Sequence, residues 1–140
     1  MKRLIASALV TVAGLCSVGN LQAQTREVRA NVPFKFIVSG KQLPAGNYEF
    51  LANGASFLVI RNREQPIAVQ SMIVGQDRTV AVADSKLVFT KYGDSYFLRE
   101  IHSSALGENG TIPRSKQEKQ AEQQEASVQH PDTVMLALGN

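Results

Sequence analysis

The stretch from residue 32 to residue 50, VPFKFIVSGKQLPAGNYEF, constrains the fold more than any other part of the chain. Apolar side chains recur at every second position over residues 34–38, and the alternation resumes at Tyr48 and Phe50. A period of two is typical of β-strands with one buried face. Between the two runs, residues 43–46 (LPAG) predict a turn, because proline presets φ and glycine adopts the positive φ that follows. These two strands are therefore expected to supply half of a small β core.

The beginning of the chain has the features of a secretory signal peptide. A cationic start over residues 1–3 precedes an apolar run over residues 4–18, and Ala23 provides the small residue before a cleavage point. The run is about 15 residues long, whereas a transmembrane helix needs about 20. Lipidation of Cys16 is not expected, because the residue before it is too large. We therefore predict a cleaved N-terminal signal helix over residues 1–23.

Loss of that segment changes what the composition implies. The 15 basic and 12 acidic residues of the whole chain give a net charge of +3, but two of the basic residues lie within residues 1–23. The remaining residues are close to neutral and form no basic stripe, so nucleic acid is not an expected partner. The only cysteine, Cys16, also leaves, and no disulfide, thiol nucleophile or cysteine metal site is possible in residues 24–140. We predict a single periplasmic or secreted domain over these residues, without a stable membrane span.

The Asn53-Gly54 pair is the strongest local signal for a hairpin. Between alternating apolar runs it predicts a two-residue type I′ turn, which fixes the register of the flanking strands. In that register four large side chains share the core face: Tyr48, Phe50, Phe57 and Val59. Three apolar side chains fall on the other face, which is either covered or an exposed apolar patch: Leu51, Leu58 and Ile60.

A second hairpin is expected around Gly93-Asp94, between strands over residues 87–92 and 96–102. A two-residue loop pairs Phe89 with Leu98, whereas a three-residue loop shifts the pairing by one and flips the faces. We favour the two-residue loop. Further strands are expected over four ranges: residues 25–32, 67–74, 79–83 and 133–138.

The polar segment over residues 115–129 predicts a helix. Ser115 and Glu118 have the spacing of a capping box, but the segment has no apolar stripe to bury. Residues 103–113, before it, read as a loop. The whole pattern predicts an all-β fold, namely a small antiparallel sandwich or barrel of about seven strands with one polar helix near the C-terminus.

Few residues offer chemistry. Glu100 and His102 lie two residues apart on one strand face, which allows either an acid–base pair or two solvated polar side chains. The other histidine, His130, begins an HPD tripeptide that a strand-like run follows. No nucleophile elbow, glycine-rich phosphate loop or paired-carboxylate motif is present. We therefore predict no catalytic, cofactor-binding or metal-binding residues, no cofactor, and no enzymatic activity.

Four segments together resemble a family of small, exported, uncharacterised bacterial proteins. They are residues 32–36 (VPFKF), 43–48 (LPAGNY), 87–98 (LVFTKYGDSYFL) and 113–118 (PRSKQE). The likeness covers most of residues 28–129. It implies an exported β domain, and it supplies no activity and no site residue.

Three hypotheses about function follow. The first is a non-enzymatic binding or structural β domain of the cell envelope, whose partner contacts the apolar patch named above or the polar helix. The second is a barrel-type carrier of a small apolar ligand, which requires a closed sheet with an internal cavity. The third is a hydrolytic enzyme that uses Glu100 and His102, which requires both side chains in one concave pocket.

Overall fold

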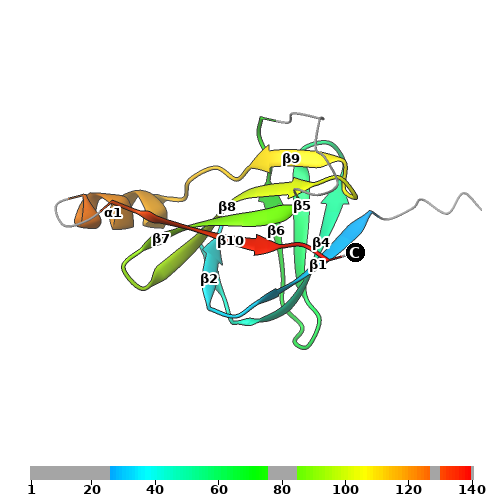
Figure 1. Cartoon of the computed structure of the whole chain (residues 1–140), viewed down its shortest axis with the longest axis horizontal. Helices are drawn as coiled ribbons and strands as arrows, with labels where there is room; N and C mark the ends of the chain where they lie inside the picture. Colours follow the sequence, from blue (N-terminus) through cyan, green and yellow to red (C-terminus); the bar gives the residue numbers. More distant parts are fainter. Residues whose placement is uncertain (1–25, 76–84, 127–129, 140) are drawn as a thin grey trace, which may run out of the picture.

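The computed structural model describes residues 26–75, 85–126 and 130–139, which form two packed β-sheets with one helix at an end (Figure 1). The predicted signal peptide, the strand expected over residues 79–83 and the end of the predicted polar helix lie outside these residues. Sheet A consists of four antiparallel strands, here in spatial order: β1 (Glu27–Val32), β4 (Gly46–Asn53), β5 (Phe57–Asn62) and β6 (Ala68–Met72).

Sheet B is larger and combines the short strands β2 and β3 with the strands that follow β6 in the chain. Its spatial order is β10 (Asp132–Ala137), β7 (Lys86–Tyr92), β8 (Ser95–Ser103), β2 (Phe36–Val38) and β3 (Lys41–Leu43). One edge of the long strand β8 is shared: β2 pairs with its first half in parallel, and β9 (Glu108–Thr111) pairs with its second half. The predicted small antiparallel sandwich is therefore confirmed, with this single parallel pair as an exception among the described ladders.

Single bridges join the two sheets at both ends of the sandwich. Arg29 of β1 pairs with Gly139, just after β10, and Val74, just after β6, pairs with Thr111 of β9. These are isolated bridges, not continuous ladders, so the sheets remain two open layers around one core. Because each bridge satisfies backbone groups at a sheet edge, it protects that edge from pairing with another chain.

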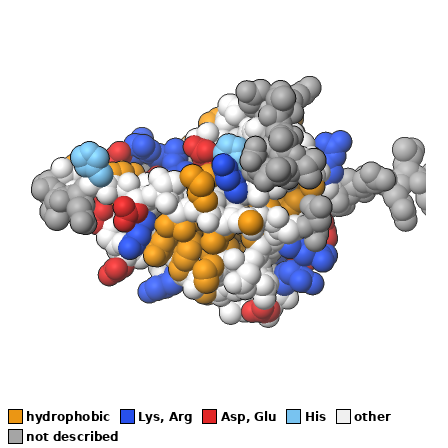
Figure 2. All heavy atoms as spheres, in the orientation of Figure 1, with side chains coloured by type: hydrophobic (Ala, Val, Ile, Leu, Met, Phe, Trp, Pro, Cys, Tyr) orange, Lys and Arg blue, Asp and Glu red, His pale blue; other side chains and the backbone are white. Residues whose placement is uncertain are grey.

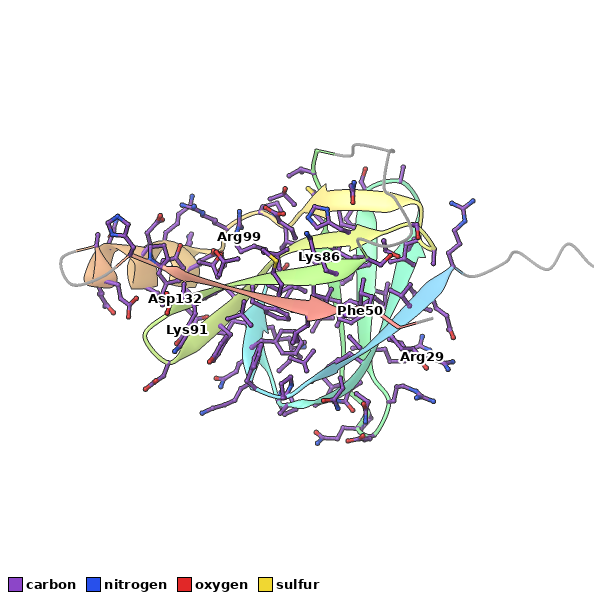
Figure 3. The ribbon with its side chains drawn as sticks, in the orientation of Figure 1. Arg29, Phe50, Lys86, Lys91, Arg99 and Asp132 are labelled. Carbon is purple, nitrogen blue, oxygen red and sulfur yellow. The ribbon has the colours of Figure 1, made fainter. Side chains whose placement is uncertain are left out.

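The core follows from the period-two alternation. In β1 the side chains of Val28, Ala30 and Val32 are buried while their neighbours are exposed, as the sequence predicts. The largest fully buried side chains come from both sheets: Phe36, Leu43, Tyr48, Phe50, Leu58, Ile60, Leu87, Phe89, Leu98, Ile101, Leu106 and Ile112. These side chains fill the space between the layers, and Figure 3 shows Phe50 among them.

Pro33 marks the crossover from one sheet to the other. β1 ends at Val32 in sheet A, and the next strand begins at Phe36 in sheet B. Between them the ring of Phe34 stacks on Tyr96, with ring centroids 4.0 Å apart, and meets Phe89 edge-on at 5.2 Å. The chain thus leaves sheet A at Pro33, and the aromatic residue after it fixes the crossover on sheet B.

The register predicted for the Asn53-Gly54 hairpin is wrong. Gly54, Ala55 and Ser56 form a three-residue loop, and Phe50 pairs with Ile60 instead of Phe57. The carbonyl oxygen of Ser56 accepts a hydrogen bond from the Ile73 amide at 2.8 Å, which ties the loop to the end of β6.

The shift from the predicted pairing is odd, so it exchanges the two faces of β5. Leu58 and Ile60 are fully buried, whereas Phe57 is 40% exposed. The apolar patch predicted from Leu51, Leu58 and Ile60 therefore does not exist. The apolar pair that is exposed instead joins β5 to β6: it is Phe57 and its cross-strand partner Met72, which is 49% exposed.

A two-residue hairpin loop occurs instead at Ser39-Gly40, between β2 and β3. Both residues have positive φ, at 50° and 78°, as a type I′ turn requires. The Ser39 hydroxyl is 2.8 Å from the hydroxyl of Ser71, so the turn is also held by β6 of the other sheet.

The second hairpin has the predicted two-residue loop. Phe89 pairs with Leu98 and Lys91 with Tyr96, which confirms the favoured register. Beyond Phe89 the register shifts, because Arg99 is an extra residue on β8 and Val88 pairs with Glu100. This β-bulge lies in the candidate site described below.

Two predictions about the last third of the chain are confirmed and one is wrong. The helix α1 (Lys116–Glu125) has Ser115 as N-cap, whose hydroxyl accepts from the Glu118 amide at 3.2 Å. β10 returns to sheet B as expected. The expectation that residues 103–113 form only a loop is wrong, because they contain β9. Glycine is unfavourable in strands, yet Gly110 of β9 packs where a side chain would collide with Ile73. In the part of the chain that the structure describes, no helix is long and apolar enough to cross a membrane.

Candidate functional site

A groove runs over the outer face of sheet B, between β10 and the segment that connects β9 to α1. Its volume is about 470 Å³. Its walls come from β7, β8, β10 and the segment before α1: Lys86, Val88, Thr90, Arg99, Glu100, His102, Arg114, Thr133 and Met135. Figure 2 shows basic, acidic and histidine side chains gathered on the face over β7 and β8. The groove is therefore charged and mixed in character, unlike the apolar interior.

A chain of hydrogen bonds crosses the floor of the groove. His102 Nε2 donates to Glu100 Oε2 at 2.8 Å, and His102 Nδ1 lies 3.0 Å from Asn109 Oδ1. Glu100 and His102 lie on the same face of β8, as predicted. β9 pairs with β8 and places Asn109 opposite His102. The structure thus places the two predicted candidate residues in one hollow, and it adds a partner that the sequence did not reveal.

The contacts of His102 limit what its ring can do. Both ring nitrogens have hydrogen-bond partners, so neither points freely into the groove as a base or a metal ligand. General base catalysis requires such a nitrogen within reach of the proton that it removes. Across the described ranges no group of three or more His, Cys, Asp or Glu side chains is arranged to hold a metal ion. The arrangement is better suited to orienting Glu100 and His102 as hydrogen-bonding groups.

The bulge at Arg99 ties the groove to α1. The Arg99 backbone carbonyl accepts from the Ile112 amide at 2.7 Å, and its guanidinium donates to the carbonyl oxygen of Ile112. Arg99 Nε also lies 3.4 Å from Glu118 Oε1, and these side chains are only 15% and 4% exposed. Bulges often re-aim a side chain next to a functional site. Here the bulge aims an arginine at the first turn of the helix.

Glu118 is the most deeply buried charged side chain of the helix. Burial raises the pKa of the Glu118 carboxyl above its ordinary value of 4.5, and the nearby charges of Arg99 and Arg114 act in the opposite direction. Its role is to fix α1 on sheet B, where Ala121 of the helix packs on Ile37, Tyr92 and Phe97. This small apolar cluster, together with the buried Glu118, holds on sheet B a helix that has no apolar stripe.

The two remaining cations of the groove differ in their partners. Arg114 Nη1 donates to both carboxylate oxygens of Glu122, at 2.9 and 2.7 Å, and both side chains are well exposed. Lys86 lies opposite His102 across β7 and β8. Over residues 26–75, 85–126 and 130–139, Lys86 has no ion-pair partner. Figure 3 shows Lys86 and Arg99 along the same side of sheet B.

A smaller hollow of about 260 Å³ adjoins the end of α1. Its lining comes from β7, the helix and the segment before β10: Tyr92, Glu122, Glu125, Ala126, His130 and Pro131. His130 therefore lies near the helix and apart from the residues that line the groove with His102. Burial raises the pKa of Tyr92, and the charge of Glu122 acts in the same direction. Glu122 thus stands between the two hollows, lining one and binding an arginine of the other.

Comparison of the chain with protein-family models, with curated proteins and with solved structures gave no match.

Proposed function

We propose that the chain is an exported, non-enzymatic β domain that binds another component of the cell envelope in the groove on sheet B. The observation that carries this proposal is Lys86, which has no ion-pair partner among the described residues, beside the Glu100–His102–Asn109 chain in the groove. The expected signal peptide supplies the compartment.

The chemistry of the groove favours a polar ligand over an apolar one. Cavities that bury small apolar molecules are lined mainly by apolar and aromatic side chains. Here three cations, one carboxylate, one histidine and two threonines outnumber Val88 and Met135. The space between the sheets is occupied by the core side chains. The hypothesis of a carrier for an apolar ligand therefore gains no support from either place.

A titration followed by amide chemical shifts tests the proposal. Isotope-labelled protein is mixed in turn with hexaglutamate, an oligogalacturonate, maltohexaose and palmitate. We expect at least one of the three polar ligands to give saturable shifts at Val88, Glu100 and Thr133. Absence of saturable shifts with all three would contradict the proposal. Saturation by palmitate at core residues such as Phe50 would favour the carrier instead.

A hydrolytic enzyme is a second candidate, because Glu100 and His102 both line the groove. Their Oε2 and Nε2 atoms are 2.8 Å apart. Glycoside hydrolysis needs two carboxyl groups on either side of the bond, and Glu100 is the one carboxylate among the residues that line the groove. Acyl transfer needs a nucleophile bonded to the base, and the two partners of His102 in the described structure are Glu100 and Asn109. The geometry therefore ranks this candidate below binding.

Chromogenic ester and glycoside substrates test the enzyme hypothesis. Wild-type protein is compared with Glu100→Gln and His102→Gln, each purified in the same way. Turnover that both variants abolish would establish the hydrolytic hypothesis. Equal rates in all three proteins indicate a contaminant or no activity at Glu100 and His102.

A further inference from the structure

We propose that the ligand of the groove is an acidic polypeptide segment, and that Glu122 of α1 occupies Arg114 in its absence as a built-in competitor. This inference rests on the proposed function and specifies the chemistry of its ligand. It follows from the distribution of charge in the groove, from the exposure of the Arg114–Glu122 ion pair, and from the lack of phenylalanine, tyrosine and tryptophan among the lining residues.

The charges that are free to act on a ligand are positive. Glu100 is held by His102, and Arg99 is held by Glu118 and the Ile112 carbonyl. Lys86 has no counter-ion among the described residues. A lysine ammonium without a counter-ion in a groove attracts a carboxylate, and the complementary charge also raises the rate of encounter.

Arg114 provides the second cationic position, and its present partner shows what it recognises. Its Nη1 donates to both carboxylate oxygens of Glu122, a charge-assisted contact of the kind that arginine forms with carboxylates. The two side chains are 44% and 39% exposed. Exposed ion pairs of this kind contribute little to stability. A carboxylate of a ligand can therefore replace Glu122 without disrupting the fold.

The spacing of the cations suits an extended chain that carries several acids. Lys86 lies opposite His102 on β8. Three residues earlier on β8, the Arg99 carbonyl accepts from the amide of Ile112, and this second level is where the segment that carries Arg114 begins. At about 3.3 Å per residue, the two levels are about 10 Å apart along the strand. An extended peptide covers that distance with about three residues.

The apolar contacts favour a peptide over a sugar. None of the residues that line the groove is phenylalanine, tyrosine or tryptophan, whereas Met135 is 60% exposed at its edge and Val88 lies in its floor. Methionine adapts to many side-chain shapes and is common at peptide-binding surfaces. A ring on which a sugar face stacks is missing from this set. An acidic polypeptide is therefore the ligand class that fits these walls.

The test compares affinities for hexaglutamate and hexaglutamine at low ionic strength, by chemical shift titration of the purified protein. We expect hexaglutamate to bind in the groove and hexaglutamine to bind at least tenfold more weakly. Lys86→Ala and Arg114→Ala should each weaken the binding of hexaglutamate several-fold. Lys119→Ala is the matched control, because it removes the same charge from an exposed position of α1 outside the groove.

The decisive variant is Glu122→Gln. It should tighten the binding of hexaglutamate by about two- to fivefold, because the ligand no longer displaces an exposed ion pair. Glu125→Gln makes the same change of charge on the same helix without releasing Arg114, and it should have a smaller effect. Equal effects of the two variants, or equal binding of hexaglutamine, would overturn the inference. Binding of oligogalacturonate alone would also overturn it, yet would leave the proposed function standing.

Discussion

The hydroxyl of Tyr48 donates a hydrogen bond to the backbone carbonyl oxygen of Pro44, four residues earlier, at 2.6 Å. The tyrosine ring is fully buried and meets Phe36 edge-on, with ring centroids 5.1 Å apart. A tyrosine that bonds back to the backbone in this way at a corner of a β-sandwich is a tyrosine corner. The LPAG turn and the tyrosine after it therefore act as one unit, which fixes the start of β4 against the other sheet.

Substitution Tyr48→Phe should lower the free energy of unfolding by about 1–3 kcal/mol, because it leaves the Pro44 carbonyl without its partner while the ring stays in place. Urea denaturation measures the difference. Tyr96→Phe is the control, because among the described residues the Tyr96 hydroxyl has no hydrogen-bond partner and its ring contacts persist. Equal losses in the two variants would mean that the Tyr48 hydrogen bond contributes nothing specific.

Substitutions at Phe50 and Phe57 distinguish the observed hairpin register from the one that the sequence predicts. Phe50→Ala should cost about 3–5 kcal/mol, because it removes a fully buried ring. Phe57→Ala should cost less than about 1 kcal/mol, because its ring is 40% exposed on the outer face of sheet A. The predicted pairing places both rings in the core and requires similar losses. Urea midpoints of the two variants decide between the registers.

The error at Asn53-Gly54 shows where local sequence stops determining structure. Both possible loops satisfy the preference of Asn-Gly for a turn, and apolar side chains occupy both faces of the strands on either side. The choice is made by partners distant in sequence, namely the Ile73 amide that binds Ser56 and the core that takes Leu58 and Ile60. Alternation at β1 was unambiguous, because only one of its faces is apolar.

The candidate site was predictable only within one strand. The spacing of Glu100 and His102 placed them together, and the structure confirms that contact. Asn109 was out of reach because β9 is short, polar and contains Gly110, so nothing in its composition indicates a strand. The position of Lys86 beside His102 was also unpredictable. Without the bulge at Arg99, Lys86 would pair with Ile101, and the bulge moves the pairing by one residue to His102. A bulge leaves no signal in the local pattern of a strand.

Of the described glycines, Gly110 leaves the least room for a side chain. A Cβ at this position would lie 1.6 Å from Ile73 Cγ2, far inside van der Waals contact. Gly110→Ala should therefore lower the free energy of unfolding by about 1–3 kcal/mol or more, as overpacking does. Gly139→Ala is the control, because the Cβ would meet its nearest atom at an ordinary 3.7 Å.

A double-mutant cycle identifies the cause of that loss. If the clash with Ile73 is responsible, Gly110→Ala combined with Ile73→Ala should be less destabilised than the sum of the two single variants. Thermal denaturation of the four proteins gives the coupling. Strict additivity would show that the loss at Gly110 arises from the backbone of β9 and not from this contact.

The buried pair of Arg99 and Glu118 predicts a specific pH dependence of stability. Burial raises the pKa of Glu118 above 4.5 in the folded protein, so from about pH 4.5 upward the native state holds this proton more tightly than the unfolded chain does. The free energy of unfolding therefore contains a contribution that is fully present below pH 4.5 and is lost as the pH rises through the raised pKa.

Glu118→Gln should lack this loss, so its stability relative to wild type should improve steadily over that interval. Urea denaturation at a series of pH values measures the difference, with Asp94→Asn as an exposed carboxylate control. A constant difference between wild type and Glu118→Gln across the interval would show that Glu118 ionises as easily in the folded protein as in the unfolded chain.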